Sequence, residues 1–119
     1  MPSLKLLADR GQPTDQYRLP AEKRLEGDPL QSLWLDYEDG SGVFAVGHWH
    51  SEVGKWRVSY TEEEYCQILE GVSLVTDDQG HATRLEPGNS FVVPRGFQGT
   101  WEVVEPTLKR FVVYEAKGG

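Results

Sequence analysis

The sequence is short of the features that mark secreted and membrane proteins. Its single cysteine, Cys66, excludes an internal disulfide. No run approaches the ~20 apolar residues that a membrane-spanning helix requires. The amino-terminal residues lack the apolar stretch and the small-residue cleavage site of a secretory signal. We therefore expect a protein of a reducing compartment, by default the cytoplasm, with no membrane partner.

Basic residues are also scarce. Twelve Lys and Arg residues stand against nineteen Asp and Glu residues, which gives a net charge of −7. This balance argues against nucleic acids and anionic membranes as partners. A length of 119 residues fits one domain. A small-molecule ligand and a second copy of the chain, forming a homodimer, remain the expected partners.

The first thirty residues differ in character from the rest. Residues 1–30 are polar and irregular, and they are interrupted by Pro2, Pro13, Pro20 and Pro29. We predict an extended N-terminal arm over 1–30. The arm either packs on the remaining chain or crosses to a partner subunit, and the sequence does not decide between these.

Residues 31–119 contain short apolar runs, rich in Val, Tyr, Phe, Trp and Thr, that are separated by turn residues. Helical spacing of apolar residues is absent, so the pattern predicts an antiparallel all-β domain. Gly71 interrupts the longest run and predicts a bend or bulge. Asp77 to Gly80 predicts a hairpin loop. The expected strands cover residues 31–37, 42–50, 55–60, 64–76, 82–86, 90–93, 100–104 and 109–116.

Two ordered motifs identify the fold more closely. In the first, Glu64 precedes Gly71 with six residues between them, and in the second, Gly88 precedes Pro94-Arg95-Gly96. At this separation the pair resembles the two conserved motifs of the cupin superfamily. The resemblance implies a single RmlC-like jelly-roll barrel, with the arm in front of it.

A narrower resemblance covers about residues 27–116. The chain is similar to the ureidoglycine-aminohydrolase-like group of cupins, which includes ethanolamine-utilisation proteins. Leu108 departs from the group, where an arginine often precedes the lysine. The residues that carry the similarity are Trp49, Trp56, Tyr60, Glu64, 99–103, Glu105, Pro106 and Lys109.

The resemblance also predicts that the usual cupin metal site is absent. Metal-binding cupins use a His-x-His pair, a glutamate and a later histidine. The corresponding positions here are Val58, Tyr60, Glu64 and Gly99, so only the glutamate remains. Since a first-row metal normally needs three or more protein ligands, we expect no cofactor. An unknown divalent ion is the alternative.

A second metal site is conceivable on another strand. His48 and His50 are two residues apart, so a strand would point both to one face. We expect them to be a strand-edge or surface pair, with a metal site as the alternative.

Alternation along the strands predicts an apolar cavity with a few polar groups, which is typical of small-molecule sites. The alternative is that these side chains only fill the barrel. We predict that Gly99, where a histidine is missing, leaves room for a ligand. Cys66 is either a wall residue or a buried, inert thiol. The predicted ligand-binding residues are Trp56, Val58, Cys66, Gly99 and Trp101.

Glu64 and Tyr60 are the predicted catalytic residues. A carboxylate facing the interior is costly to bury without a bonding partner, and we expect Tyr60 to be that partner. A partly desolvated glutamate can act as a general acid or base. It can equally be a satisfied structural residue.

Three functions follow from these features. The first is a small-molecule-binding cupin without the usual metal. The second is a small enzyme that uses Glu64 on a polar metabolite. The third is a dimeric interaction module.

Overall fold

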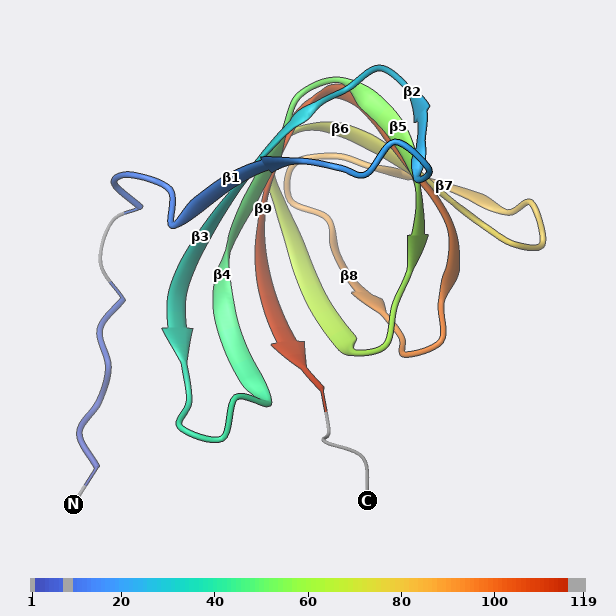
Figure 1. Cartoon of the computed structure of the whole chain (residues 1–119). Helices are drawn as coiled ribbons and strands as arrows, with labels where there is room; N and C mark the ends of the chain where they lie inside the picture. Colours follow the sequence, from blue (N-terminus) through green and yellow to red (C-terminus); the bar gives the residue numbers. More distant parts are fainter. Residues whose placement is uncertain (1, 8–9, 116–119) are drawn as a thin grey trace.

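The structure of the chain is a computed structural model that describes residues 2–7 and 10–115. These residues form nine β-strands and no helix (Figure 1). Accordingly, the described residues include no helix that could cross a membrane. The strands are β1 (Asp15–Arg18), β2 (Arg24–Glu26), β3 (Leu30–Glu38), β4 (Phe44–Ser51), β5 (Gly54–Ser59), β6 (Glu63–Asp77), β7 (Ala82–Leu85), β8 (Ser90–Val93) and β9 (Gln98–Tyr114).

The two longest strands, β6 and β9, form the centre of the fold. They pair antiparallel along nearly their whole lengths. The second half of β9 also pairs with β4, and its first half also pairs with β5. β9 therefore has neighbours on both sides, and the sheet curls around a common interior, as Figure 1 shows. The prediction of an antiparallel all-β domain is confirmed.

Gly71 lies at a bend in β6, as predicted. Its φ is +85°, and a Cβ at this position would lie 2.0 Å from the carbonyl oxygen of Pro106. The register between the strands shifts on both sides of Gly71. The prediction of two separate strands over 100–104 and 109–116 is wrong, because Pro106 lies opposite this bulge, where its missing N–H interrupts no ladder bond. Residue 116 of that run lies outside the described residues.

The predicted hairpin connects β6 to β7. Gly80 has φ +86° and donates its backbone N–H to the carbonyl oxygen of Asp77 at 3.1 Å. The Asp77 carboxylate accepts backbone hydrogen bonds from Gln79 and His81, both at 2.9 Å. The hairpin projects from the curled sheet (Figure 1).

The N-terminal region is more regular than the sequence indicated. β1 pairs with β3, and β2 pairs with β5, so residues 15–26 extend the sheet. The described residues before β1 form no strand, and there Leu4 and Leu6 are each 94% exposed. Residue propensities did not predict these short strands, because pairing with β3 and β5 stabilises them and their own apolar content does not.

The buried core lies within the curl of the sheet. Three tryptophans dominate it, and their rings meet edge to face. The cluster consists of Trp49, Trp56, Cys66, Ile68, Leu85, Trp101, Val103 and Phe111.

Candidate functional site

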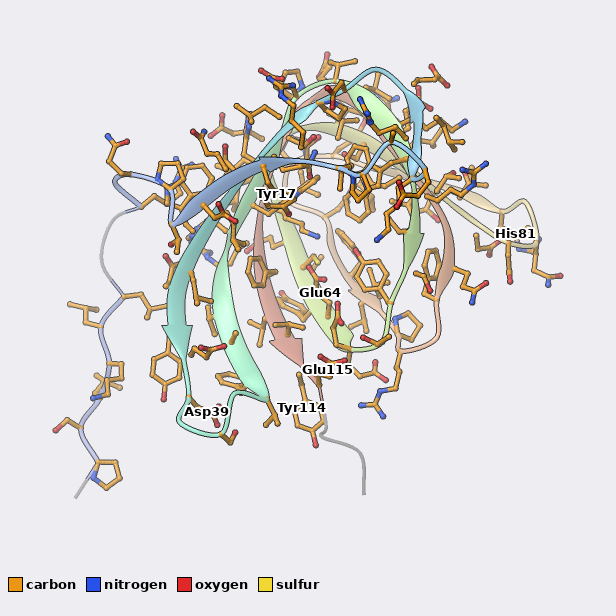
Figure 2. The ribbon with its side chains drawn as sticks, viewed as in Figure 1. Tyr17, Asp39, Glu64, His81, Tyr114 and Glu115 are labelled. Atoms are coloured by element: carbon orange, nitrogen blue, oxygen red, sulfur yellow. The ribbon has the colours of Figure 1, made fainter. Side chains whose placement is uncertain are left out.

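A cavity of about 390 Å³ lies inside the curled sheet. Strands β3, β4, β5, β6 and β9 contribute to its wall, and so do β1 and the segment between β1 and β2. Figure 2 shows Glu64 within the curl and Tyr17 on the strand that crosses its opening. The lining residues are Tyr17, Leu19, Lys23, Gln31, Leu33, Trp49, Trp56, Arg57, Val58, Ser59, Tyr60, Glu62, Glu64, Trp101, Lys109, Phe111 and Val113.

A buried ion pair lies in the wall of this cavity. Lys109 Nζ lies 2.8 Å from Glu64 Oε2, and the two side chains are 6% and 10% exposed. Burial opposes the charged form of Lys109, but the neighbouring Glu64 carboxylate outweighs it and raises the pKa of Lys109. Lys109 is therefore a fixed ammonium at neutral pH, which excludes it as an amine nucleophile.

Two tryptophans hold the ammonium group from the sides. Lys109 Nζ lies 4.8 Å from the centroid of the Trp49 ring and 4.6 Å from that of Trp101. The Trp49 indole donates its N–H to Gln31 at 2.8 Å, and the Trp101 indole donates to Ser73 at 3.0 Å. These bonds fix the rings with their faces toward the cation, which favours cation–π attraction.

The two oxygens of the Glu64 carboxylate have different surroundings. Oε2 receives the Lys109 ammonium and also a hydrogen bond from the Cys66 thiol at 3.2 Å. Both of these contacts are to Oε2, and no described residue donates a hydrogen bond to Oε1. Since Glu64 lines the cavity, Oε1 is the oxygen left to accept a hydrogen bond from a ligand.

Cys66 lies behind Glu64 and is not among the lining residues. It is fully buried, and burial raises the pKa of its thiol to about 12. The thiol is therefore neutral and acts as a donor to Glu64. The structure favours the buried, inert thiol over a wall residue.

Tyr60 lines the cavity, but the prediction that it bonds Glu64 is wrong. The partner is Lys109, whose positive charge compensates the carboxylate better than a phenol can. The Tyr60 ring packs edge-on against Phe97, with 6.3 Å between ring centroids. Burial raises the pKa of Tyr60, so its hydroxyl stays protonated.

The remaining predicted ligand-binding residues divide into two groups. Trp56, Val58 and Trp101 line the cavity, as predicted. Their contact with a ligand stays a prediction. Gly99 does not line it. A Cβ at Gly99 would lie 2.0 Å from the carbonyl oxygen of Thr76, so strand β6 fills the space that we expected a ligand to use.

His48 and His50 lie on the outer face of β4, since Trp49 between them faces the cavity. The prediction of a strand-edge or surface pair is wrong for His48, which is buried on a strand that lies between β3 and β9, with its Nδ1 2.7 Å from a carboxylate oxygen of Asp36. His81 is exposed at the hairpin tip (Figure 2). Among the described residues, no three His, Cys, Asp or Glu side chains gather closely enough to hold a metal ion.

The sequence did not predict that Lys109 lines the cavity, nor that the N-terminal residues Tyr17, Leu19 and Lys23 do. Lys109 alternates with Phe111 and Val113, which also line the cavity, and a lysine within an apolar inward-facing set was the available signal. Tyr17 and Leu19 gave no such signal, because their place depends on how β1 pairs with β3.

Solved structures share this fold. The ethanolamine utilization protein Q of Salmonella typhimurium LT2 is 17% identical, with a TM-score of 0.65, and the match covers 73% of this chain and 71% of that one. A DUF861-family protein of unknown function from Pseudomonas syringae pv. tomato is 18% identical, with a TM-score of 0.75, over 92% of this chain and only 45% of that one. A DUF861-family protein from Thermotoga maritima is 34% identical, with a TM-score of 0.53, over 54% of this chain and 73% of that one.

No curated protein matches the sequence. At the sequence level, residues 38–111 match the EutQ-like cupin domain. This segment contains Trp49, Glu64, Trp101 and Lys109, so it includes the ion pair and the two tryptophans that flank it. The chain belongs to the EutQ-like cupin domain family.

Proposed function

We propose that this chain binds a small molecule in the cavity, with Glu64 as the polar anchor. The observation that carries the proposal is the buried Glu64–Lys109 pair in the wall of a cavity that Trp49, Trp56 and Trp101 also line. Burying two charges costs free energy, and well-packed apolar residues often stabilise a core equally well. A ligand that donates a hydrogen bond to Glu64 Oε1 gives this pair a role beyond folding.

The ion pair also affects whether Glu64 needs a metal ion as a cofactor. The Lys109 ammonium is the cation beside Glu64, so the carboxylate needs no metal ion for charge compensation. We therefore propose a cupin that binds its ligand without a tightly held metal. Elemental analysis of untagged protein, purified without added metal, should give well under one divalent ion per chain. A value near one, lost together with ligand binding on chelation, would contradict the proposal.

A variant that fills the cavity tests the binding function directly. Val58 is half-buried and lines the cavity, so Val58→Trp places a large side chain in the ligand space. Ligand-observed NMR with a panel of small polar metabolites should show saturable binding to the wild type and none to this variant. Val53→Trp, at a position 56% exposed and outside the cavity, is the matched control and should bind like the wild type. Equal binding by all three proteins would place the ligand elsewhere.

Catalysis by the same site is the second candidate, in line with the resemblance to ureidoglycine-aminohydrolase-like cupins. The supporting observation is a cavity-lining carboxylate beside a protonated amine. Glu64 would act as a general base and accept a proton from the substrate. Glu64→Gln should then abolish turnover while the variant still binds the substrate. Unchanged turnover would rule out this role.

A homodimer is a separate proposal, carried by the outer face of the sheet. Phe44, Tyr65, Val92 and Tyr114 are 37–59% exposed there. Phe44 pairs with Tyr114, and Tyr65 pairs with Val92, so they form two apolar pairs on neighbouring strands. We propose that a second copy covers this face, and that the exposed leucines of the N-terminal arm contribute. A monomer by light scattering at high concentration would overturn it.

A further inference from the structure

Two basic residues lie together in the wall of the cavity. Lys23 comes from the segment between β1 and β2, and Arg57 comes from β5. The backbone N–H of Arg57 donates to the carbonyl oxygen of Lys23 at 2.9 Å, and Arg57 Nη1 donates to the carbonyl oxygen of Glu22 at 3.1 Å. These bonds hold the two residues at neighbouring positions.

Neither cation has a carboxylate partner within the described part of the chain. The ion pairs there use other basic residues, including Arg24 with Asp28 and Lys55 with Glu26. Both Lys23 and Arg57 are exposed residues that line the cavity, and the Arg57 N–H groups other than Nη1 are left to meet a ligand.

The charge of the cavity wall is opposite to that of the protein. Lys23, Arg57 and Lys109 line it together with Glu62 and Glu64, so three positive charges meet two negative ones. The whole chain carries −7. In a protein this acidic, a cavity with a net positive wall attracts anions in preference to cations.

We propose that the ligand is a small organic acid that carries its carboxylate at one end and a hydrogen-bond donor at the other. Arg57 and Lys23 bind the carboxylate, and Arg57 can do so through two parallel hydrogen bonds. The donor end faces Glu64 Oε1, and the apolar body lies against Trp56 and Tyr60. This inference rests on the proposed binding function and names the class of ligand.

The site also depends on a segment outside the family match. Residues 38–111 match the EutQ-like cupin domain, whereas Lys23, Tyr17 and Leu19 precede that range and still line the cavity. Arg57 lies within it. The carboxylate site therefore combines one residue of the domain with one residue of the N-terminal segment.

Matched pairs of probes test the proposal. Small aromatic acids such as 4-hydroxybenzoate are compared with their primary amides, which keep the shape and lose the charge, and with 4-methoxybenzoate, which loses the donor. Binding is measured by NMR titration of untagged protein at low salt. We expect the hydroxy acid to bind at least tenfold more tightly than either relative, and its affinity to fall several-fold in 0.5 M salt, since exposed charges are screened.

Variants then locate the carboxylate. Arg57→Gln should weaken binding of the acid roughly fivefold and Lys23→Gln about threefold, with little effect on the amide. Lys55→Gln removes the same charge from β5 outside the cavity and should leave both affinities unchanged.

The outcomes separate this inference from the function on which it rests. Equal binding of acid and amide, blocked by Val58→Trp, would overturn the organic-acid inference and leave the binding function intact. Preference for inorganic phosphate over the acids would overturn the carboxylate assignment. No saturable binding of any probe would contradict both proposals.

Discussion

The two faces of the sheet formed by β6 and β9 reverse the usual distribution of side chains. On the inner face, Glu64 is 8% exposed and Lys109 is 5% exposed. On the outer face, Tyr65 is 44% exposed and Tyr114 is 47% exposed. Exposed single apolar residues are ordinary, but buried charges and adjoining apolar residues on a surface both require partners. This comparison motivates our two proposals, a small ligand for the inner face and a second copy of the chain for the outer one.

The largest effect should come from breaking the inner ion pair. Lys109→Met leaves the Glu64 carboxylate buried without its cation, and we expect a loss of about 3–5 kcal/mol in the free energy of unfolding. Urea denaturation measures it. The adjacent outward-facing residue gives the control, since Arg110→Met changes the same charge at an exposed position and should cost under about 0.5 kcal/mol.

A double variant sharpens this result. Glu64→Leu combined with Lys109→Met removes both charges and should recover most of the stability lost in Lys109→Met alone. Recovery of folding together with loss of ligand binding would show that the pair serves binding. If the double variant is as unstable as the single one, the pair is instead needed for folding.

The next-largest effect on stability should come from alkaline pH, through titratable groups inside the curled sheet. The pKa of Lys109, of Tyr60 and of Cys66 is raised in the folded state, to about 12 for Cys66. A group with a raised folded pKa stabilises the fold below its unfolded pKa and loses that contribution as the pH rises through the folded one. Stability should therefore be flat with respect to these groups from pH 7 to 8 and decline above pH 9, where an unfolded thiol ionises.

Urea denaturation at several pH values tests this decline. Cys66→Ala is the matched variant, because it removes the group that titrates first and should flatten the curve between pH 9 and 10. An unchanged curve would mean that the thiol does not contribute. In native wild-type protein, Cys66 should also react with iodoacetamide at pH 8 at least a hundredfold more slowly than in urea, since it is fully buried.

The smallest effect on folding should come from the outer face. Val92 is 59% exposed, so Val92→Lys should change the free energy of unfolding by less than about 0.5 kcal/mol. If a second copy covers this face, however, the charge should shift the protein toward monomer in light scattering. His81→Lys, on the projecting hairpin, adds a charge elsewhere and should leave the oligomeric state unchanged. A Val92→Lys protein that stays dimeric would move the interface to another surface.

Much of the fold could be predicted from residue patterns along the chain. Alternating apolar residues identified the strands, Gly71 identified the bend in β6, and Asp77 to Gly80 identified the hairpin. Alternation also identified Trp56, Glu64 and Trp101 as inward-facing. The short strands β1 and β2 could not be predicted, because their residues are mostly exposed and only pairing with β3 and β5 orders them.

The sequence by itself determined which residues of a predicted strand share a face, because successive side chains in a strand point to opposite sides. Only the tertiary structure decided which inward-facing residues meet. Glu64 contacts Lys109, and not Tyr60, because the pairing of β6 with β9 places Lys109 opposite Ile68 on the same face as Glu64, and the long Lys109 side chain reaches the carboxylate from there. Gly99 borders β6, and not the cavity, for the same reason. The register between strands distant in sequence depends on the packing of the whole sheet, and so the chemistry of the site does too.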